Sequence, residues 1–255
     1  MGAALAIEYS KRGARLALLA RRTGRLQALA DSLVATGAQV AVYTADVTRD
    51  GEVARCVAIL RAQGLDIDVV IANAGFSVAG RLQDLSLLDY RRQFETNVFG
   101  VLRTVHESLD ALRASAGRVV IVGSVAGYAA APGASAYAMS KFAVRALAES
   151  LRGELRPQGI GVTLISPGFV DSDIRRTDNR GQVFADYRDP IPRWLRMRSG
   201  KAARIMADGI DAGRAEVIVT LHGRLIILFT RHCHRLVRWL SVHFVRWRKQ
   251  VAARS

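Results

Sequence analysis

The sequence of 255 residues predicts one α/β domain, a doubly wound parallel sheet with helices on both faces. Between Gly2 and Ser166, short apolar runs alternate with stretches of helical period, which is the pattern of strands joined by crossover helices. The apolar runs are too short and too apolar to be surface helices. The chain is long enough to bury a full core, so we expect a single large domain.

Each element of this pattern can be bounded from the residues. We expect strands at Arg15–Ala20, Gln39–Tyr43, Asp68–Ala72, Arg118–Gly123, Gly161–Ile165 and Glu216–Thr220. Helical spacing covers Ala3–Arg12, Thr23–Thr36, Gly51–Gln63, Leu87–Leu112 and Tyr137–Arg156, and glycines end the first three. Residues 169–200 have no clear period, which is typical of a lid or binding loop. We assign residues 1–221 to the α/β domain, with a lid region at 169–200, and residues 222–255 to an extension.

Basic residues dominate the charge, with a formal net charge of +15 and an isoelectric point near 11.0. Most of the cations are arginines, which often reflects genome composition. The net charge alone therefore does not identify a binding partner. Residues 217–255 are more informative, because they contain no acidic residue and these cations: Arg224, Arg231, Arg235, Arg238, Arg246, Arg248, Lys249 and Arg254. The 2 cysteines lie far apart, which argues against a disulfide framework and favours a reducing compartment.

The extension has the pattern of an amphipathic helix between Arg224 and Lys249. One arc of the helical wheel holds Leu225, Ile226, Phe229, Cys233, Leu236, Val237, Leu240, Phe244 and Trp247, and the opposite arc is cationic. Such a helix fits an anionic membrane surface, with its apolar side among the acyl chains. The alternatives are packing on the domain or on a second subunit. Nucleic acid is disfavoured because no recognition motif accompanies the arginines, and a metal at His232, Cys233 and His234 because adjacent residues diverge on a helix.

A tyrosine and a lysine suggest acid–base chemistry. Tyr137 and Lys141 are four positions apart in an expected helix, so their side chains share one face. A free tyrosine has a pKa of about 10, whereas a general acid or base works best near 7. An ammonium at roughly 4–6 Å supplies about 3–4 kcal/mol at an effective dielectric near 20, which is much of the required shift. Ser124, at the end of a strand, is placed to hold a substrate oxygen beside the phenol.

Such a pair alone is a common accident, but further motifs accompany it in a specific order. They are Asp46-Val47, Asn73-Ala74-Gly75, Asn97 in NVFG, Ser124 in GSVAG, Tyr137 and Lys141 in YAMSK, and Pro167-Gly168. In these motifs, over about residues 2–172, the chain resembles the short-chain dehydrogenase/reductase family. The resemblance implies a Rossmann-like fold and a nicotinamide cofactor.

The resemblance also implies a role for each of these residues. Tyr137 would be the acid/base, Lys141 would bind the nicotinamide ribose and tune the tyrosine, Ser124 would orient the carbonyl, and Asn97 would support a proton-relay water. The cofactor would be bordered by Asp46 and Val47 at the adenine, by Asn73, Ala74 and Gly75 along its floor, and by Pro167, Gly168 and Ser172 at the nicotinamide. By residue type alone, Asn73 and Gly75 are also ordinary turn residues, and Asp46 an ordinary cap.

The end of the expected strand Arg15–Ala20 bears on the choice of cofactor. An acidic residue there accepts hydrogen bonds from the adenosine ribose, whereas an arginine accommodates a 2′-phosphate. The chain places Arg21 and Arg22 at this point. Because a guanidinium group matches phosphate, the resemblance implies NADP(H) rather than NAD(H), with Arg21 the better candidate. The alternative is two solvated arginines in an arginine-rich chain.

The chain departs from the family at its amino terminus. The first family strand and its Thr-Gly-rich turn are missing, and only Gly2 matches the last glycine of that turn. The missing strand would lie between the strands at Arg15–Ala20 and Asp68–Ala72. Its absence leaves backbone groups without partners, at about 1–3 kcal/mol for each buried group. We therefore expect the coding sequence to extend upstream, with Met1 as an internal methionine.

These observations predict an NADP(H)-dependent oxidoreductase that interconverts a carbonyl and a secondary alcohol by hydride transfer, with residues 1–221 as its catalytic domain. The lid residues Phe169, Val170, Ile174 and Trp194 and a membrane-bound extension favour a lipophilic substrate. The competing hypothesis is a non-catalytic membrane-associated or scaffold protein that retains the fold. We expect a cytoplasmic protein, peripheral on the cytoplasmic face of a membrane, without a metal; a homo-oligomer stays open.

Overall fold

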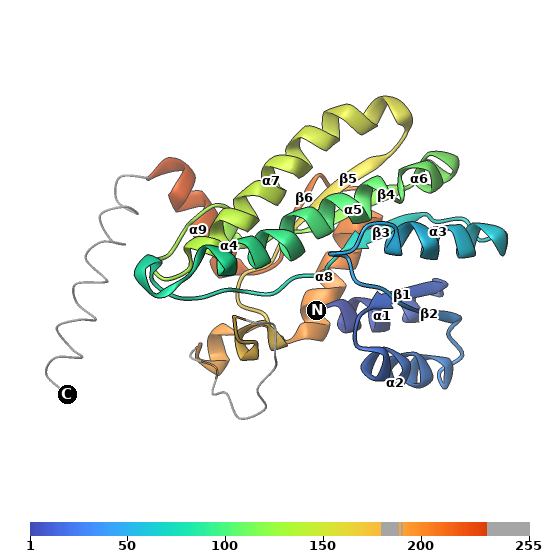
Figure 1. Cartoon of the computed structure of the whole chain (residues 1–255), viewed down its shortest axis with the longest axis horizontal. Helices are drawn as coiled ribbons and strands as arrows, with labels where there is room; N and C mark the ends of the chain where they lie inside the picture. The colour runs from blue at the N-terminus through green and yellow to red at the C-terminus, as the bar shows by residue number, and fades with distance from the viewer. Residues whose placement is uncertain (180–188, 190, 234–255) are drawn as a thin grey trace, which may run out of the picture.

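The computed structural model describes residues 1–179, 189 and 191–233, and their strands form two parallel sheets (Figure 1). The smaller sheet pairs β1 (Leu16–Ala20) with β2 (Val40–Thr44). The larger has the order β3-β4-β5-β6, from strands Val69–Ala72, Arg118–Val122, Gly161–Ser166 and Glu216–Ile218. Every strand lies where its apolar run predicts it, and the α/β class with parallel pairing is confirmed.

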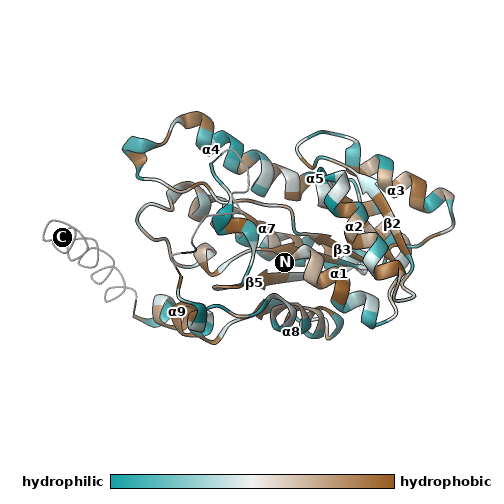
Figure 2. Cartoon of the chain, turned by 90° about the horizontal axis from the view of Figure 1, so that it is seen from below, coloured by the Kyte–Doolittle hydropathy of each residue, from teal (hydrophilic) through white to brown (hydrophobic). Residues whose placement is uncertain are grey.

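Helices cover both faces of the larger sheet (Figure 2). On one face, α5 (Gly100–His106) and α7 (Ser135–Leu155) contribute Val101, Val105, Val144 and Ala148 to a core with β4 and β5. On the other face, α1 (Gly2–Lys11) and α8 (Ser199–Asp211) pack Leu5, Ala203 and Met206 against Val120 and Ile165. Strands β4 and β5 are therefore buried from both sides and read as continuous apolar runs.

The smaller sheet is attached differently. Within the described residues, no strand joins β1 to β3, and the exposed fraction of Leu19 on β1 is 36%, close to the 37% of Val69 on β3. Helix α1 contacts both β1 and α8, and Arg12 at its end pairs with Asp208 and Asp211, at 2.6 Å each. A helix and a group of ion pairs thus connect β1 and β2 to the rest of the protein. The remaining helices of this region are α2 (Thr23–Val34) and α3 (Glu52–Ala62).

Two helical segments differ from the sequence prediction. The single helix expected at Leu87–Leu112 is divided into α4 (Leu87–Phe94), a π-helical segment (Glu95–Phe99), α5, and a separate α6 (Leu109–Ser115). Its break falls at Glu107, whose carboxylate accepts the backbone N–H groups of Gly51 and Ala54 at the start of α3, at 2.8 Å each. Helix α8 has no counterpart in the prediction, although Ala203, Met206 and Ile210 recur at helical spacing on its buried face.

The first part of the extension forms α9 (Leu221–His232), which packs on the domain. Its buried face consists of Gly223 and Ile227, and Ile227 contacts Val125 and Tyr128. Leu225 and Phe229 of the predicted apolar arc lie instead on the outer face, with exposed fractions of 47% and 50%. The arc from Leu236 onward lies outside the described residues.

Candidate active site

The candidate site lies at the carboxyl edge of the larger sheet, where parallel strands deliver their following loops to one place. Strand β3 leads into Asn73–Gly75, β4 into Gly123 and Ser124, and β5 into Pro167 and Gly168. Helix α7 starts beside these loops and carries Tyr137 and Lys141 in its first two turns. The predicted catalytic residues therefore come from neighbouring elements of the buried sheet.

Ser124 and Tyr137 are joined by a hydrogen bond between their side chains. The Ser124 hydroxyl also accepts the N–H of Ala126 at 3.1 Å, as the cap of a short 3-10 helix (Val125–Gly127). This turn approaches α7 closely, since a Cβ on Gly127 would lie 2.7 Å from the carbonyl oxygen of Lys141. Gly127, the last residue of GSVAG, thus allows Ser124 and Tyr137 to approach each other.

Lys141 is buried under the same strand end. Its Nζ donates a hydrogen bond to the carbonyl oxygen of Val122 at 2.8 Å and lies 5.8 Å from the centre of the Tyr137 ring. Its exposed fraction is only 5%, and burial lowers the pKa of the ammonium from 10.5 to about 8. The group is therefore still largely charged at neutral pH.

The electrostatics of Tyr137 differ from the sequence prediction, which lowered its pKa through Lys141. Burial raises the pKa of Tyr137 above its ordinary value of 10, because the anionic form loses hydration. Two influences oppose this rise: the hydrogen bond from Ser124 and the positive charge of Arg175. Arg175 comes from the lid region, where it donates to Asp189 at 2.9 Å and to the Val170 carbonyl at 3.1 Å. No sequence signal distinguished it from the other arginines.

Asn97 lies in the π-helical segment and is fully buried. Its amide accepts the N–H of Phe76 at 3.1 Å and donates to the Phe76 carbonyl at 3.0 Å and to the Ser140 hydroxyl at 3.2 Å. The Ser140 hydroxyl in turn donates to the Tyr137 carbonyl at 2.7 Å. Asn97 thus braces the loop after β3 against the turn of α7 that carries Tyr137. A π-helical turn at this position is typical of functional sites.

The predicted cofactor residues line two regions. Gly2 opens α1 directly against Asn73, so that a Cβ on Gly2 would lie 2.7 Å from the Asn73 Nδ2 atom. Ala74 follows in the same loop, and Gly75 lies against Asn97. On the opposite side, the Pro167 carbonyl accepts the N–H of Val125 at 2.9 Å. Gly168 lies against Thr220 and His222, and Ser172 precedes a short 3-10 helix (Asp173–Arg176).

The residues expected at the adenosine end lie on the smaller sheet. Asp46 follows β2 and accepts the N–H of Thr48 at 3.0 Å, and Val47 packs against Gly100. Arg21 follows β1, and its guanidinium is 3.7 Å from an Asp46 oxygen with 60% of its side chain exposed. Arg22 is exposed and precedes α2. The two arginines are therefore not part of the cluster around Tyr137.

The chain matches known proteins along most of its length. The family model described as short chain dehydrogenase matches residues 1–183. An uncharacterized oxidoreductase of Myxococcus xanthus is 34% identical over 85% of this chain and 82% of its own length. An 11-beta-hydroxysteroid dehydrogenase A of Arachis hypogaea is 35% identical over 94% of this chain and 70% of its own length. The chain is a short-chain dehydrogenase/reductase.

Solved structures of other short-chain dehydrogenases agree with this assignment. A short-chain dehydrogenase of Sphingobium yanoikuyae in complex with NADPH is 26% identical, with a TM-score of 0.74 over 98% of this chain and 91% of its own. A member from Burkholderia phymatum in complex with NAD is 25% identical, with a TM-score of 0.80 over 92% and 90% of the chains. The family, the fold and the oxidoreductase class predicted from the sequence are confirmed.

The residues of this dehydrogenase/reductase fit a nicotinamide dinucleotide. Gly2 at the start of α1 has no side chain, and a Cβ there would meet Asn73. The backbone N–H groups at the start of a helix are suited to bind phosphate. Within residues 1–179, 189 and 191–233, no group of three or more histidine, cysteine or acidic side chains is placed to hold a metal ion.

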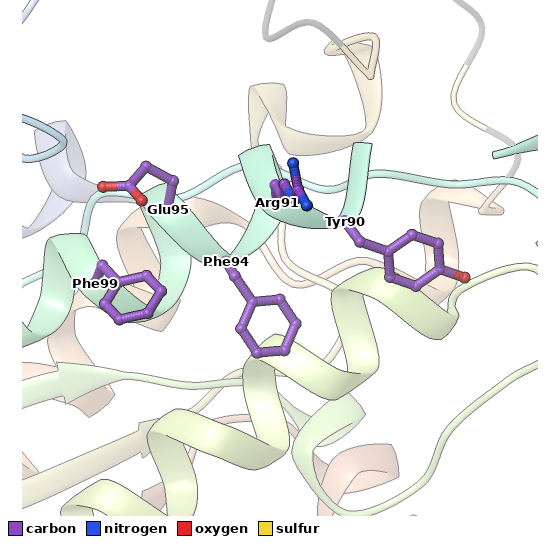
Figure 3. Close-up of a pocket in the computed structure, with 5 residues that line it drawn as sticks. All are labelled: Tyr90, Arg91, Phe94, Glu95 and Phe99. Carbon is purple, nitrogen blue, oxygen red and sulfur yellow. The ribbon is translucent and has the colours of Figure 1, made fainter. Parts of the chain in front are cut away.

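A surface hollow of about 330 Å³ lies elsewhere on the short-chain dehydrogenase/reductase (Figure 3). It is lined by Tyr90, Arg91, Phe94, Glu95 and Phe99 of α4 and the π-helical segment. None of these side chains belongs to the predicted site. Its lining is open to solvent, in contrast to the buried surroundings of Lys141 and Asn97.

Proposed function

We propose that this dehydrogenase/reductase uses NADP(H) to interconvert a carbonyl group and a secondary alcohol on a lipophilic substrate at a membrane surface. The observation that carries the proposal is the hydrogen bond between Ser124 and Tyr137 one helical turn from a buried ammonium. A proton donor, a second hydroxyl and a positive charge then converge on one point, which is what carbonyl reduction requires.

A nicotinamide cofactor, when bound, would supply or accept the hydride. Tyr137 donates its phenolic proton to the carbonyl oxygen as that oxygen gains negative charge, and Ser124 holds the same oxygen by its hydroxyl. The raised pKa keeps Tyr137 protonated at neutral pH, which suits donation of a proton in the reductive direction. Lys141 projects from α7 and donates from its Nζ to the Val122 carbonyl at the end of β4, where it would hold the ribose of a bound cofactor. Asn97 holds the loop after β3 against the turn of α7 that carries Tyr137.

The preference for NADP(H) is proposed from Arg21. Its guanidinium is exposed at the end of β1, and its one ion pair within the described residues is a 3.7 Å contact with Asp46, so it is able to turn toward a 2′-phosphate. Arg22 adds a second positive charge beside it. The complexes of similar structures contain both NADPH and NAD, so these two side chains carry the proposal.

A lipophilic substrate is supported by relatives and by surface residues. Several relatives are named 11-beta-hydroxysteroid dehydrogenase or 11-beta-hydroxysteroid dehydrogenase-like, and a steroid is a bulky apolar molecule. Of the lid residues expected to contact substrate, Val170 is buried in the core and Phe169 stacks on His222. Neither side chain is therefore free to contact a substrate. Trp194, with an exposed fraction of 83%, and Ile174 are the lid residues left for this role.

Membrane association is proposed from the outer face of α9. Leu221, Leu225, Leu228 and Phe229 lie on this face, with exposed fractions of 72%, 47%, 53% and 50%, and Arg224 and Arg231 flank them. Eight cations and no acidic residue in residues 217–255 favour an anionic lipid surface as the occupant. No helix in the described part of the chain is long and apolar enough to cross a bilayer.

The enzyme proposal is tested on the full chain with a panel of ketones of increasing apolar size. We expect NADPH to be oxidised, with kcat/KM rising as the ketone becomes larger and with NADH at least tenfold poorer. Binding of the cofactors is followed separately by NADPH fluorescence. No binding of either cofactor would contradict the proposal, and binding without turnover of any ketone would support the scaffold hypothesis.

The membrane proposal is tested by flotation with vesicles of phosphatidylcholine, with and without phosphatidylserine. Phe229→Glu is expected to reduce binding to the anionic vesicles several-fold, because it places a charge on the apolar face. Val34→Glu, at a side chain with a similar exposed fraction of 54% on α2, is the matched control and is expected to bind normally. Equal binding by all three proteins would contradict the proposal.

A further inference from the structure

The first turn of α9 contacts the loop after β5 directly. Thr220 caps this helix, is almost completely buried, and accepts the N–H of Gly223 at 3.2 Å. His222, two residues later, turns toward the loop Pro167–Phe169. The structure therefore brings a histidine of the extension next to the loop that the family resemblance implies at the nicotinamide.

The contact of His222 is a specific hydrogen bond. Its Nε2 accepts the backbone N–H of Phe169 at 2.9 Å and lies 3.2 Å from the Thr220 hydroxyl. Because a backbone N–H only donates, Nε2 must carry no proton, and the neutral ring has its proton on Nδ1. The imidazole also stacks on the Phe169 ring, with the two centres 5.1 Å apart and the planes at 22°.

Gly168 shows how closely the histidine and the loop meet. A Cβ at this position would collide with both the Thr220 hydroxyl and the His222 Nε2 atom. The loop is further held by Val125, whose N–H donates to the Pro167 carbonyl at 2.9 Å, and by Met197, whose N–H donates to the Phe169 carbonyl at 2.9 Å. The hydrogen bond from the Phe169 N–H to His222 thus holds the loop between these two backbone hydrogen bonds.

We propose that His222 is a positioning residue, whose neutral imidazole sets the path of Pro167–Phe169 against the nicotinamide. The inference rests on the proposed function, because the loop matters to the reaction only if a nicotinamide cofactor binds beside it. Without the His222 Nε2 acceptor, the Phe169 N–H lacks its partner. The loop is then free to move between its two remaining backbone hydrogen bonds.

Protonation of His222 abolishes the contact. A proton on Nε2 would face the Phe169 N–H, so that two donors would meet. Burial lowers the pKa of His222 below its ordinary value of 6.5, which keeps the ring neutral in the physiological range. Among the described residues, three charged groups on the adjoining elements have other partners: Arg224 pairs with the Ile218 carbonyl, Asp171 with Arg196, and Glu216 with Tyr128 and Arg231.

Two substitutions separate the roles of the ring and of its acceptor atom. His222→Phe keeps an aromatic ring for stacking on Phe169 but removes the acceptor, and His222→Gln keeps an acceptor but removes the ring. In the cofactor-free full chain, NMR should find exchange of the Phe169 amide hydrogen at least tenfold faster in His222→Phe. His222→Gln should stay close to the wild type. The ¹⁵N shifts of His222 should report the Nδ1–H form in the wild type.

Cofactor affinity is then measured by fluorescence between pH 5 and 8. At pH 7.5 we expect His222→Phe to bind NADPH about tenfold more weakly and His222→Gln nearly normally. As the pH falls below 6.5, the wild type should lose affinity relative to His222→Gln. Titration of the cofactor phosphate is common to both proteins and cancels in this comparison.

The outcomes distinguish the inference from the proposed function. Failure of the wild type to bind either cofactor overturns both. A wild type that binds while His222→Phe matches it in affinity overturns the positioning role alone, even if the Phe169 amide exchanges faster. Weak binding by both variants to the same extent also overturns it, because loss of the acceptor would then have no specific effect.

Discussion

The two sheets of this protein differ in how well their strands are covered. In β4 and β5 nearly every residue is buried, because helices cover both faces and each strand has a strand on both sides. In β1 and β2 the residues are half-buried or exposed, and only one strand edge of each is paired within the described residues. The candidate catalytic residues lie on the loop and helices next to the larger sheet, and the residues proposed to select the cofactor follow β1 of the smaller sheet.

This division has a physical reason. A proton donor must be held within a fraction of an ångström, and buried neighbours provide that restraint. A contact to a phosphate group is made by a long charged side chain, which works from an exposed position. We therefore expect substitutions in the larger sheet to act on chemistry and stability, and those in the smaller sheet to act on cofactor choice.

The largest effect is expected for Tyr137→Phe. Loss of the phenolic proton should reduce kcat by about 10³-fold, while the affinity for NADPH changes less than threefold. Steady-state kinetics and fluorescence titration measure the two quantities. Tyr128→Phe is the matched control, since it removes another phenolic hydroxyl next to the Val125–Gly127 turn. If Tyr128→Phe lowers kcat as strongly, the effect is not specific to Tyr137.

The second prediction compares stability in the two sheets. Ile121→Ala in β4 removes a fully buried side chain and should lower the free energy of unfolding by about 3 kcal/mol. Leu19→Ala in β1 removes a side chain that is 36% exposed and should cost about 1 kcal/mol. Urea unfolding measures both values. Equal losses would mean that the smaller sheet is as well packed as the larger.

The third prediction concerns the pH dependence that Lys141 introduces. Its pKa is about 8 in the folded protein against 10.5 when unfolded, so the folded state binds fewer protons between these values. The free energy of unfolding should therefore rise with pH in this window and stay at its lower level below pH 8. Relative to Lys141→Met, the gain from pH 8 to 9.5 should be about 2 kcal/mol. Parallel profiles would show that the ammonium is hydrated in the folded state.

The fourth prediction concerns cofactor choice and the substitution Arg21→Ala. Loss of the guanidinium should weaken NADPH binding about tenfold, or about 1.4 kcal/mol, and leave NADH binding unchanged. Arg61→Ala, on the exposed surface of α3, is the control for a general loss of positive charge. A similar loss for both cofactors would place Arg21 away from the 2′-phosphate and would remove the main support for NADP(H).

Prediction from the sequence succeeded where one segment contains the whole signal. The strands follow from apolar runs, and the shared face of Tyr137 and Lys141 follows from their spacing. It failed where two segments interact, as at Glu107, which breaks an expected helix by capping α3. The buried face of α9 could not be predicted either, because Leu225 and Ile227 are equally apolar and only the surface beneath the helix separates them.

Local patterns were thus sufficient for the family, the strand positions and the candidate acid–base pair, because backbone geometry alone decides which near neighbours share a face. The surroundings of that pair were decided by folding. Burial raises the pKa of Tyr137, Arg175 from the lid region opposes the rise, and His222 from α9 fastens the loop beside it. Hydration and charge at a point depend on everything packed around it, and those groups come from segments far apart in the chain.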